Sequence, residues 1–274
     1  MSDTPITFRQ RVTIQRTDTG IAYVHLARAE KYNGLDLDML YALVEAAKSL
    51  RKDRSVRAVI LQGEGKAFCA GLDFASVMSK PLGILRAFVK WGGRSTNIFQ
   101  QACWAWRTLP VPVIAVTHGH CFGGGLQIAL AADFRFTTPD CEFSVMEIKW
   151  GLIPDMTGSV TLRELVPLDV AKALTMTGRI IDGEEALHLN LVTGVSDTPL
   201  AEAEALAQEL LTRSPDALAA TKQLFRETWQ APEDVAFDVE SKLQFRLLRG
   251  KNQRRAMQAA RKKEPARFLP RRFN

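Results

Sequence analysis

Three consecutive glycines, Gly123 to Gly125, constrain this chain more than any other feature. They stand between a buried apolar strand and an apolar helix, in the segment PVIAVTHGHCFGGGLQIALAAD. Glycines leave the backbone N–H groups at the start of the helix uncovered, where the helix dipole is positive. The segment therefore predicts a strand–loop–helix unit that binds an anion or a developing oxyanion. The alternative is that the glycines only allow close packing of helix and strand.

The apolar periodicity predicts an α/β core followed by a helical region. Two strands joined by a DTG turn open the chain, and a β-β-α-β order then partly repeats. Asp36 is the expected N-cap of the first helix. The expected core strands are 11–17, 20–27, 56–63, 112–119 and 134–138, and the core helices are 35–53, 97–108 and 126–133. From about Thr157 the pattern is nearly all helical and includes three longer amphipathic segments between Pro199 and Lys263.

Two carboxylates lie in the mostly apolar stretch SVMEIKWGLIPDMTG, at Glu147 and Asp155. Apolar surroundings disfavour an ionised carboxylate, so two at this spacing suggest an acid and a base. The loop GEGKAFCAGLD follows a strand and offers a further backbone N–H. Two such donors aimed at one oxygen stabilise the enolate of a thioester or similar carbonyl. The alternative is a surface glutamate and a turn aspartate that follows a proline.

Other chemistries find little support in the sequence. His118 and His120 are two residues apart and could bind a metal, but no third ligand stands beside them. Cys69 has no nearby histidine, and the four cysteines form no CxxC pair, which indicates reduced intracellular thiols. The start MSDTPITFRQ does not read as a secretory signal, and the apolar runs are too short to span a bilayer. We therefore expect no metal, no membrane segment and a cytoplasmic location.

The net charge of +6 is uneven along the chain. Residues 246–274 hold 11 Lys and Arg and one acid, which leaves 25 Lys and Arg against 29 acids elsewhere, a balance of −4. The basic tail is open to three interpretations: a solvated helix face, an anion site for a phosphorylated ligand, or a nucleic-acid surface. No nucleic-acid motif elsewhere supports the third interpretation.

These ordered motifs resemble the crotonase (enoyl-CoA hydratase/isomerase) superfamily over roughly residues 10–270. The resemblance rests on NGLD at 33–36, AFCAGLD, the glycine-triplet segment, SVMEIKWGLIPDMTGS and the basic, Phe-containing tail. It implies a spiral of repeated ββα units over residues 1–198, which carries the acyl-CoA site. It also implies a helical C-terminal region at 199–274 for oligomerisation and CoA contact, in a homotrimer or a dimer of trimers.

The resemblance also implies roles for individual residues around an acyl-CoA thioester. The N–H groups of Leu72 and Gly124 would hold the thioester oxygen, and Glu147 and Asp155 would move protons. Residues 74–96 would cover the acyl pocket. The residues implied along the CoA path are Ala70, Gly71, Asp73, Phe74, Ala75 and Gly125, with Arg28 or Lys31 and the tail cations around Lys262, Lys263 and Arg267 as partners of the CoA phosphates.

One position departs from the hydratase pattern. Hydratases of the family have one glutamate two residues after the glycine triplet and another in the later segment, and this chain has Gln127 and Glu147. An amide cannot act as a general base. Dienoyl-CoA isomerases have a Glu and an Asp at the positions of Glu147 and Asp155, although they carry an Asp where Gln127 stands. Some dehalogenases have a nucleophilic Asp at the second position without the Glu.

The sequence therefore favours an acyl-CoA double-bond isomerase that converts a 3,5-dienoyl-CoA to the 2,4-dienoyl-CoA. It would need no cofactor, because coenzyme A is part of the substrate. A 2-enoyl-CoA hydratase of fatty-acid β-oxidation is the alternative. A non-catalytic CoA- or RNA-binding family member is the second alternative.

Overall fold

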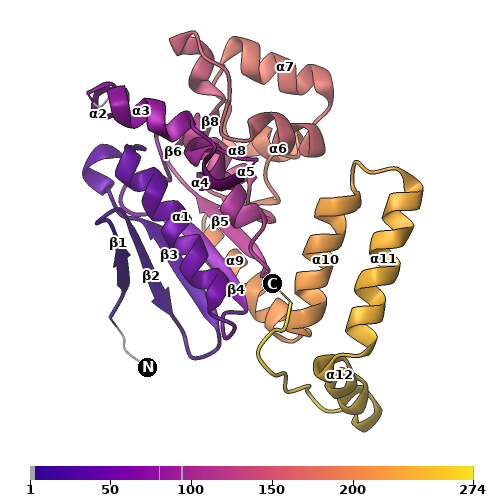
Figure 1. Ribbon diagram of the computed structural model, residues 1–274. Coiled ribbons are helices and arrows are strands. Elements are labelled where there is room, and N and C mark those ends of the chain that lie inside the picture. The colour runs from indigo at the N-terminus through magenta and orange to yellow at the C-terminus, as the bar shows by residue number, and fades with distance from the viewer. Residues whose placement is uncertain (1–3, 80, 94, 274) are drawn as a thin grey trace.

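The computed structural model describes residues 4–79, 81–93 and 95–273 (Figure 1). Residues 1–3, part of the N-terminal stretch considered above, and Lys80 and Arg94, part of the expected acyl-pocket cover, lie outside the described residues. A mixed sheet with the strand order β1-β2-β3-β4-β5-β7-β9 forms the centre, and β6 and β8 make a small parallel sheet beside it. The strands are β1 Ile6–Phe8, β2 Val12–Arg16, β3 Ile21–Leu26, β4 Ala58–Gly63, β5 Val113–Thr117, β6 His120–Phe122, β7 Phe134–Thr137, β8 Glu142–Ser144 and β9 Gly194–Val195.

Helices surround this sheet, and they are connected by short loops. The helices are α1 Leu37–Lys52, α2 Phe74–Met78, α3 Pro81–Phe88, α4 Ile98–Arg107, α5 Gly124–Leu130, α6 Gly158–Leu165, α7 Leu168–Thr177, α8 Gly183–His188, α9 Pro199–Leu211, α10 Pro215–Thr228, α11 Glu233–Leu248 and α12 Lys251–Lys262, with short 3-10 turns at Ala29–Lys31, Trp91–Gly93 and Met146–Trp150. The α/β spiral expected from the sequence is confirmed by the similarity to solved structures reported below.

The central strands β3, β4, β5 and β7 pair in parallel. As is usual for parallel strands, both faces of this part of the sheet are buried. Side chains of β4 alternate between two cores, as the two-residue period of a strand requires. Val59 and Leu61 join the core under α1 and α4, while Ala58 and Ile60 pack with α9. The helix α9 thus covers one face of the sheet, although it belongs to the segment that the sequence placed in the C-terminal region.

Side-chain caps stabilise the N-terminal ends of two helices, α1 and α4. The Asp36 carboxylate accepts from Met39 N at 2.7 Å, which confirms the predicted N-cap of α1. Asn97 and Gln100 form a reciprocal capping box at the start of α4. Both caps satisfy backbone N–H groups that a helix start leaves unpaired.

The structure differs from the sequence prediction at two sets of helix boundaries. The helix α5 begins at Gly124, two residues before the expected start, so Gly124 and Gly125 form its first turn. The C-terminal region has four helices within the described residues rather than three long segments, because the chain turns between Leu248 and Lys251 with Gly250 as N-cap of α12. Residues 6–8, 120–122, 142–144 and 194–195 are strands that were not predicted.

The helices α10 to α12 extend away from the sheet, and the chain then returns toward it (Figure 1). The Arg271 guanidinium is buried and donates to the carbonyls of Leu50, Arg51 and Asp53 at the end of α1. Asn252 and Asp216 hold the same segment through hydrogen bonds to Leu269 and Arg272. The tail therefore packs against the end of α1. Among the described residues, none of the helices is long and apolar enough to cross a membrane.

Candidate active site

Two loops meet at the carboxyl ends of β4 and β5, where parallel sheets commonly bind ligands. Cys69 N donates to His120 O at 2.9 Å, and Phe122 N donates to Cys69 O at 3.0 Å, so the loops run side by side. Gly71 has φ of +92°, and a Cβ on it would lie 3.0 Å from Phe122 O. A side chain at Gly71 would therefore strain the backbone and separate the loops.

The approach of the two loops brings two backbone N–H groups to one place. Within the described part of the chain, neither Leu72 N nor Gly124 N donates to a protein acceptor. Gly124 is the first residue of α5, where N–H groups have no intrahelical partner. This arrangement can stabilise a negative oxygen.

Gly125, which the resemblance implies along the CoA path, packs against the loop that contains Cys69. A Cβ on Gly125 would lie 2.5 Å from Cys69 O and 2.6 Å from Cys69 Cβ. Gly125 is buried against the neighbouring loop and is not among the residues that line the cavity described next. Its contact fixes the distance between α5 and the loop that carries Leu72. Close packing thus explains why a glycine stands at position 125. The backbone N–H of Gly124 has no protein acceptor within the described residues.

A cavity of about 360 Å³ opens beside these N–H groups. Its wall is mostly apolar and comes from α2, α3, α4, both loops and the segment 146–156. The lining residues are Ala70, Gly71, Leu72, Phe74, Val77, Met78, Ile84, Phe88, Phe99, Gly123, Gly124, Met146, Glu147, Trp150, Leu152, Ile153, Asp155 and Met156. Such a wall suits an acyl chain, because apolar surface is removed from water there.

Glu147 and Asp155 are the two carboxylates of this cavity. Burial raises the pKa of Glu147, and hydrogen bonds from its own backbone N–H and from Gln127 oppose that rise. Burial likewise raises the pKa of Asp155. Glu147 Oε2 is buried and has no hydrogen-bond partner within the described residues. The cavity thus offers two proton carriers, and Glu147 has an oxygen without a partner.

Gln127 lies behind the cavity wall and binds Glu147 and the backbone that follows Asp155. Its Nε2 donates to Glu147 Oε1 at 2.6 Å, and its Oε1 accepts from Met156 N and Gly158 N, each at 2.8 Å. Gln127 is 2% exposed and does not line the cavity. Its amide group therefore holds Glu147 and the segment next to Asp155 in one arrangement, and both amide atoms are engaged by protein.

The residues implied for the CoA path occupy different environments. Ala70, in the loop, and Ala75, on α2, are exposed, and Lys31 is exposed as well. Arg28 is buried, and its NH1 contacts Asp73 at 2.9 Å and Gly34 O at 2.9 Å. The guanidinium of Arg28 therefore stabilises the loop from inside, and Lys31 is the more accessible of the two cations.

The sequence did not identify the aromatic wall contributed by separate elements. The ring of Phe88 lies 4.9 Å from that of Phe99 on α4, and Phe74 lies 4.4 Å from Trp150. These contacts join segments about ten to seventy-five residues apart, so no local pattern could have indicated them.

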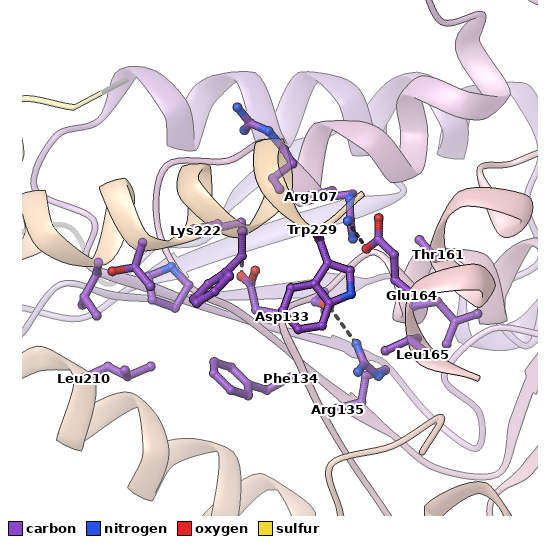
Figure 2. A pocket seen from close by; sticks show the side chains of 17 residues that line it. Arg107, Asp133, Phe134, Arg135, Thr161, Glu164, Leu165, Leu210, Lys222 and Trp229 are labelled. Carbon is purple, nitrogen blue, oxygen red and sulfur yellow. Dashed lines mark hydrogen bonds and ion pairs between the residues drawn. The ribbon is translucent and has the colours of Figure 1, made fainter. Parts of the chain in front are cut away.

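A larger cavity, of about 570 Å³, lies between α6, β7 and α10 (Figure 2). Two ion pairs lie in it: Lys222 with Asp133 at 2.6 Å, and Arg107 with Glu164. Lys222 Nζ also donates to the carbonyls of Trp106 and Val111. The Lys222 contacts connect α10 to the core, and the Arg107–Glu164 pair connects α4 to α6.

The histidines and cysteines considered above are engaged or buried. His118 contacts Gly65 O at 2.9 Å, and His120 contacts Glu142 at 2.9 Å. Burial raises the pKa of Cys69 to about 12, which disfavours the thiolate that a nucleophile requires. Among the described residues, no three His, Cys, Asp or Glu side chains are grouped as a metal site would need.

A model of the enoyl-CoA hydratase/isomerase family matches residues 16–269, and the chain therefore belongs to this family, within the crotonase superfamily. It is 35% identical over 212 residues to the carnitinyl-CoA dehydratases of Salmonella typhi and Salmonella typhimurium, which covers 76% of this chain and 77% of each relative.

Two crystal structures of enoyl-CoA hydratases confirm the fold class. The Mycobacterium smegmatis structure has a TM-score of 0.82 at 27% identity and covers 94% of this chain and 98% of its own. The Mycobacterium tuberculosis structure has a TM-score of 0.83 at 27% identity and covers 95% of this chain and 99% of its own.

Proposed function

We propose that this protein is an acyl-CoA double-bond isomerase that converts a 3,5-dienoyl-CoA to the 2,4-dienoyl-CoA. The observation that carries the proposal is the amide of Gln127, both of whose polar atoms are bound to protein. Two glutamates that hold one water between them are therefore not available at this position. Two carboxylates, Glu147 and Asp155, remain on the apolar cavity.

In the proposed reaction, Asp155 removes a proton from the carbon next to the thioester. The N–H groups of Leu72 and Gly124 stabilise the dienolate oxygen, and Glu147 delivers a proton to the far end of the diene. Raised pKa values suit both roles, because they bring a carboxyl group closer to the pH at which it must gain and lose protons. The reaction requires no separate cofactor or metal, since the thioester itself delocalises the charge.

A 2-enoyl-CoA hydratase, or the reverse dehydratase, is the second candidate. The names of the relatives favour it, since those proteins are called hydratases and dehydratases. In this candidate Glu147 activates the water alone and Gln127 only orients it. The Gln127→Glu variant separates the two candidates, because a large gain in hydration would mean that the native site is built for another reaction.

A panel of CoA esters tests the proposal directly. The purified protein should convert a 3,5-dienoyl-CoA, with absorbance of the conjugated 2,4-dienoyl thioester appearing over time. Loss of the enoyl chromophore of a 2-enoyl-CoA reports hydration in parallel. Turnover of the 2-enoyl-CoA with no action on the 3,5-dienoyl-CoA would contradict the proposal.

We also propose a homotrimer or dimer of trimers, assembled through residues 199–274, in the cytoplasm. Exposed apolar side chains on α10 and α11, such as Phe225, Trp229, Phe237 and Phe245, support an interface there. Four buried free cysteines support a reducing compartment. Because the tail packs at the end of α1, its cations would serve a neighbouring subunit's CoA rather than their own. Sedimentation of the purified protein tests the assembly.

A further inference from the structure

Asp155 lines two cavities, and Glu147 lines one. Besides the apolar cavity of about 360 Å³, Asp155 and Ile153 border a second space of about 560 Å³ on the side of α4 and α6. The other residues around this second space are Ser95, Thr96, Gln100, Trp104, Pro154, Thr157, Ser159 and Val160. We call this space the polar chamber. Asp155 stands at the junction between it and the apolar cavity.

More hydroxyl and amide side chains border the polar chamber than border the apolar cavity, and water can hydrogen-bond to them beside Asp155. Four hydroxyl-bearing residues and the amide of Gln100 border it, in contrast with the aliphatic and aromatic wall of the other cavity. With a volume of about 560 Å³, the chamber is large enough for several water molecules.

We propose that water in the polar chamber exchanges protons with Asp155 while an acyl thioester fills the apolar cavity. Glu147 has no such route: it borders only the apolar cavity among those described, and Gln127 covers its other side. The two carboxylates would therefore differ in contact with solvent once substrate is bound. This inference rests on the proposed isomerase function.

The proposed reaction creates a need for such a route. Asp155 gains the proton that leaves the α-carbon, and Glu147 loses the proton that bonds to the far carbon, so each turnover leaves both in the wrong state. Asp155 can pass its proton to chamber water and from there to the bulk. Glu147 regains a proton from water only after the product leaves the apolar cavity.

Transfer into heavy water tests this difference without any mutation. Native protein is incubated in heavy water with 3,5-dienoyl-CoA and, in a parallel run, with 2,4-dienoyl-CoA, and both reactions are stopped after a small fraction has been converted. The unconverted 3,5-dienoyl-CoA should carry deuterium at the α-carbon, and the unconverted 2,4-dienoyl-CoA should keep its hydrogen at the far carbon. Deuterium at the far carbon of the unconverted 2,4-dienoyl-CoA, or none at the α-carbon of the unconverted 3,5-dienoyl-CoA, would overturn the inference.

A blocked chamber gives the second test. Ser159 is exposed at the chamber, so Ser159→Trp should fill it, and Ser159→Ala is the matched open control. Exchange at the α-carbon should be about tenfold slower in Ser159→Trp than in Ser159→Ala, while the first turnover keeps its rate. Equal exchange in both variants would overturn the inference alone. Native protein with neither isomerisation nor exchange would overturn the proposed function and the chamber's role with it.

Discussion

The Nε2 of Gln127 donates to Oε1 of Glu147 across 2.6 Å, while the same amide accepts two N–H bonds from the segment that follows Asp155. In Gln127→Glu, one oxygen would accept those N–H bonds and the other would face Glu147. Two carboxylates so close share a proton, because the second ionisation is strongly disfavoured.

Because Glu147 must be protonated to deliver its proton, we expect Gln127→Glu to move the basic limb of the pH–rate profile to higher pH. The variant Gln127→Met is the control: it keeps the size of the side chain, adds no charge and leaves two buried N–H groups unpaired. It should lower activity and stability and move the limb less than Gln127→Glu, because it removes the hydrogen bond that lowers the pKa of Glu147 but adds no second carboxylate. A profile of Gln127→Glu that overlays the native one would contradict the coupling.

Removal of either carboxylate should separate activity from stability. Glu147→Gln and Asp155→Asn should each reduce turnover of the dienoyl-CoA by about 10²–10⁴-fold, the usual contribution of a positioned acid or base. Both native groups have a pKa raised by burial, so the folded chain binds their protons more tightly than the unfolded chain. The stability that they contribute is present in acid and is lost as pH rises through the folded pKa.

Melting curves across pH check this sign. The variants should be more stable than the native protein at neutral pH, where native carboxylates are ionised in an apolar site. The difference should shrink below about pH 4, near the ordinary carboxyl pKa, where both states are protonated. A gap that widened in acid would contradict the cause that we assign.

The N–H of Gly124 can be deleted by a matched pair of substitutions. Gly124 is the first residue of α5, a position that accepts proline because its N–H has no helical partner. Gly124→Ala and Gly124→Pro both place a Cβ about where it meets Leu35 Cδ1 and Met156 Sδ, at 2.7 Å in the ideal geometry.

Only the proline variant also loses the donor. We expect it to fall below Gly124→Ala in kcat by about 10²–10³-fold, as when one oxyanion donor is removed. Circular dichroism and melting of both variants control for folding. Equal kcat values in two folded variants would mean that this N–H does not bind the developing charge.

Substitutions of Arg28 and of Lys31 should have different effects on stability and on substrate binding. Arg28→Met leaves Asp73 without its buried partner and should cost roughly 3 kcal/mol of stability. Lys31 is exposed, so Lys31→Ala should leave melting unchanged and raise KM for the CoA ester without changing kcat. The rise in KM should shrink with added salt, because salt screens exposed charges. A rise in KM that does not change with salt concentration would mean that Lys31 does not bind the CoA phosphates through its charge.

A substitution of Lys222 tests which of the two cavities is the active site. Lys222→Met removes the ion pair with Asp133 and the bonds to two carbonyls, and it should cost about 3 kcal/mol or more. The folded fraction at low temperature should retain native kcat, because the larger cavity lies apart from Glu147. A kcat that drops while the fold persists would place reaction chemistry in the larger cavity.

The sequence predicted the parts of the fold that follow local rules. The cap at Asp36, the core strand at 56–63 and the helices of the core rest on local sequence patterns, and they were found. The start of α5 was missed because glycine disfavours helix interiors, although tertiary packing against Cys69 holds Gly125 in a helical turn. The four C-terminal helices were read as three segments because a turn of two residues interrupts the apolar pattern only briefly.

The candidate site was predictable in its residues but not in their environments. Glu147 and Asp155 were recognised from an apolar segment, and the structure puts both on one cavity. The internal pairing of Arg28 with Asp73 could not be read from sequence, since the two residues lie forty-five positions apart. The second face of Asp155 depends on α4 and α6, which only the folded chain brings to that side.

The contact between Gly125 and Cys69 lies behind the loops that carry Leu72 and Gly124. On that side, backbone meets backbone with no space for a methyl group, so a substitution there damages the fold before it changes the substrate. Another part of the wall is made of side chains on α2 and α3, namely Val77, Met78, Ile84 and Phe88, and Met78 is 68% exposed. Descendants of this sequence could therefore acquire new acyl preferences by changes in α2 and α3, while the oxyanion side stays as it is.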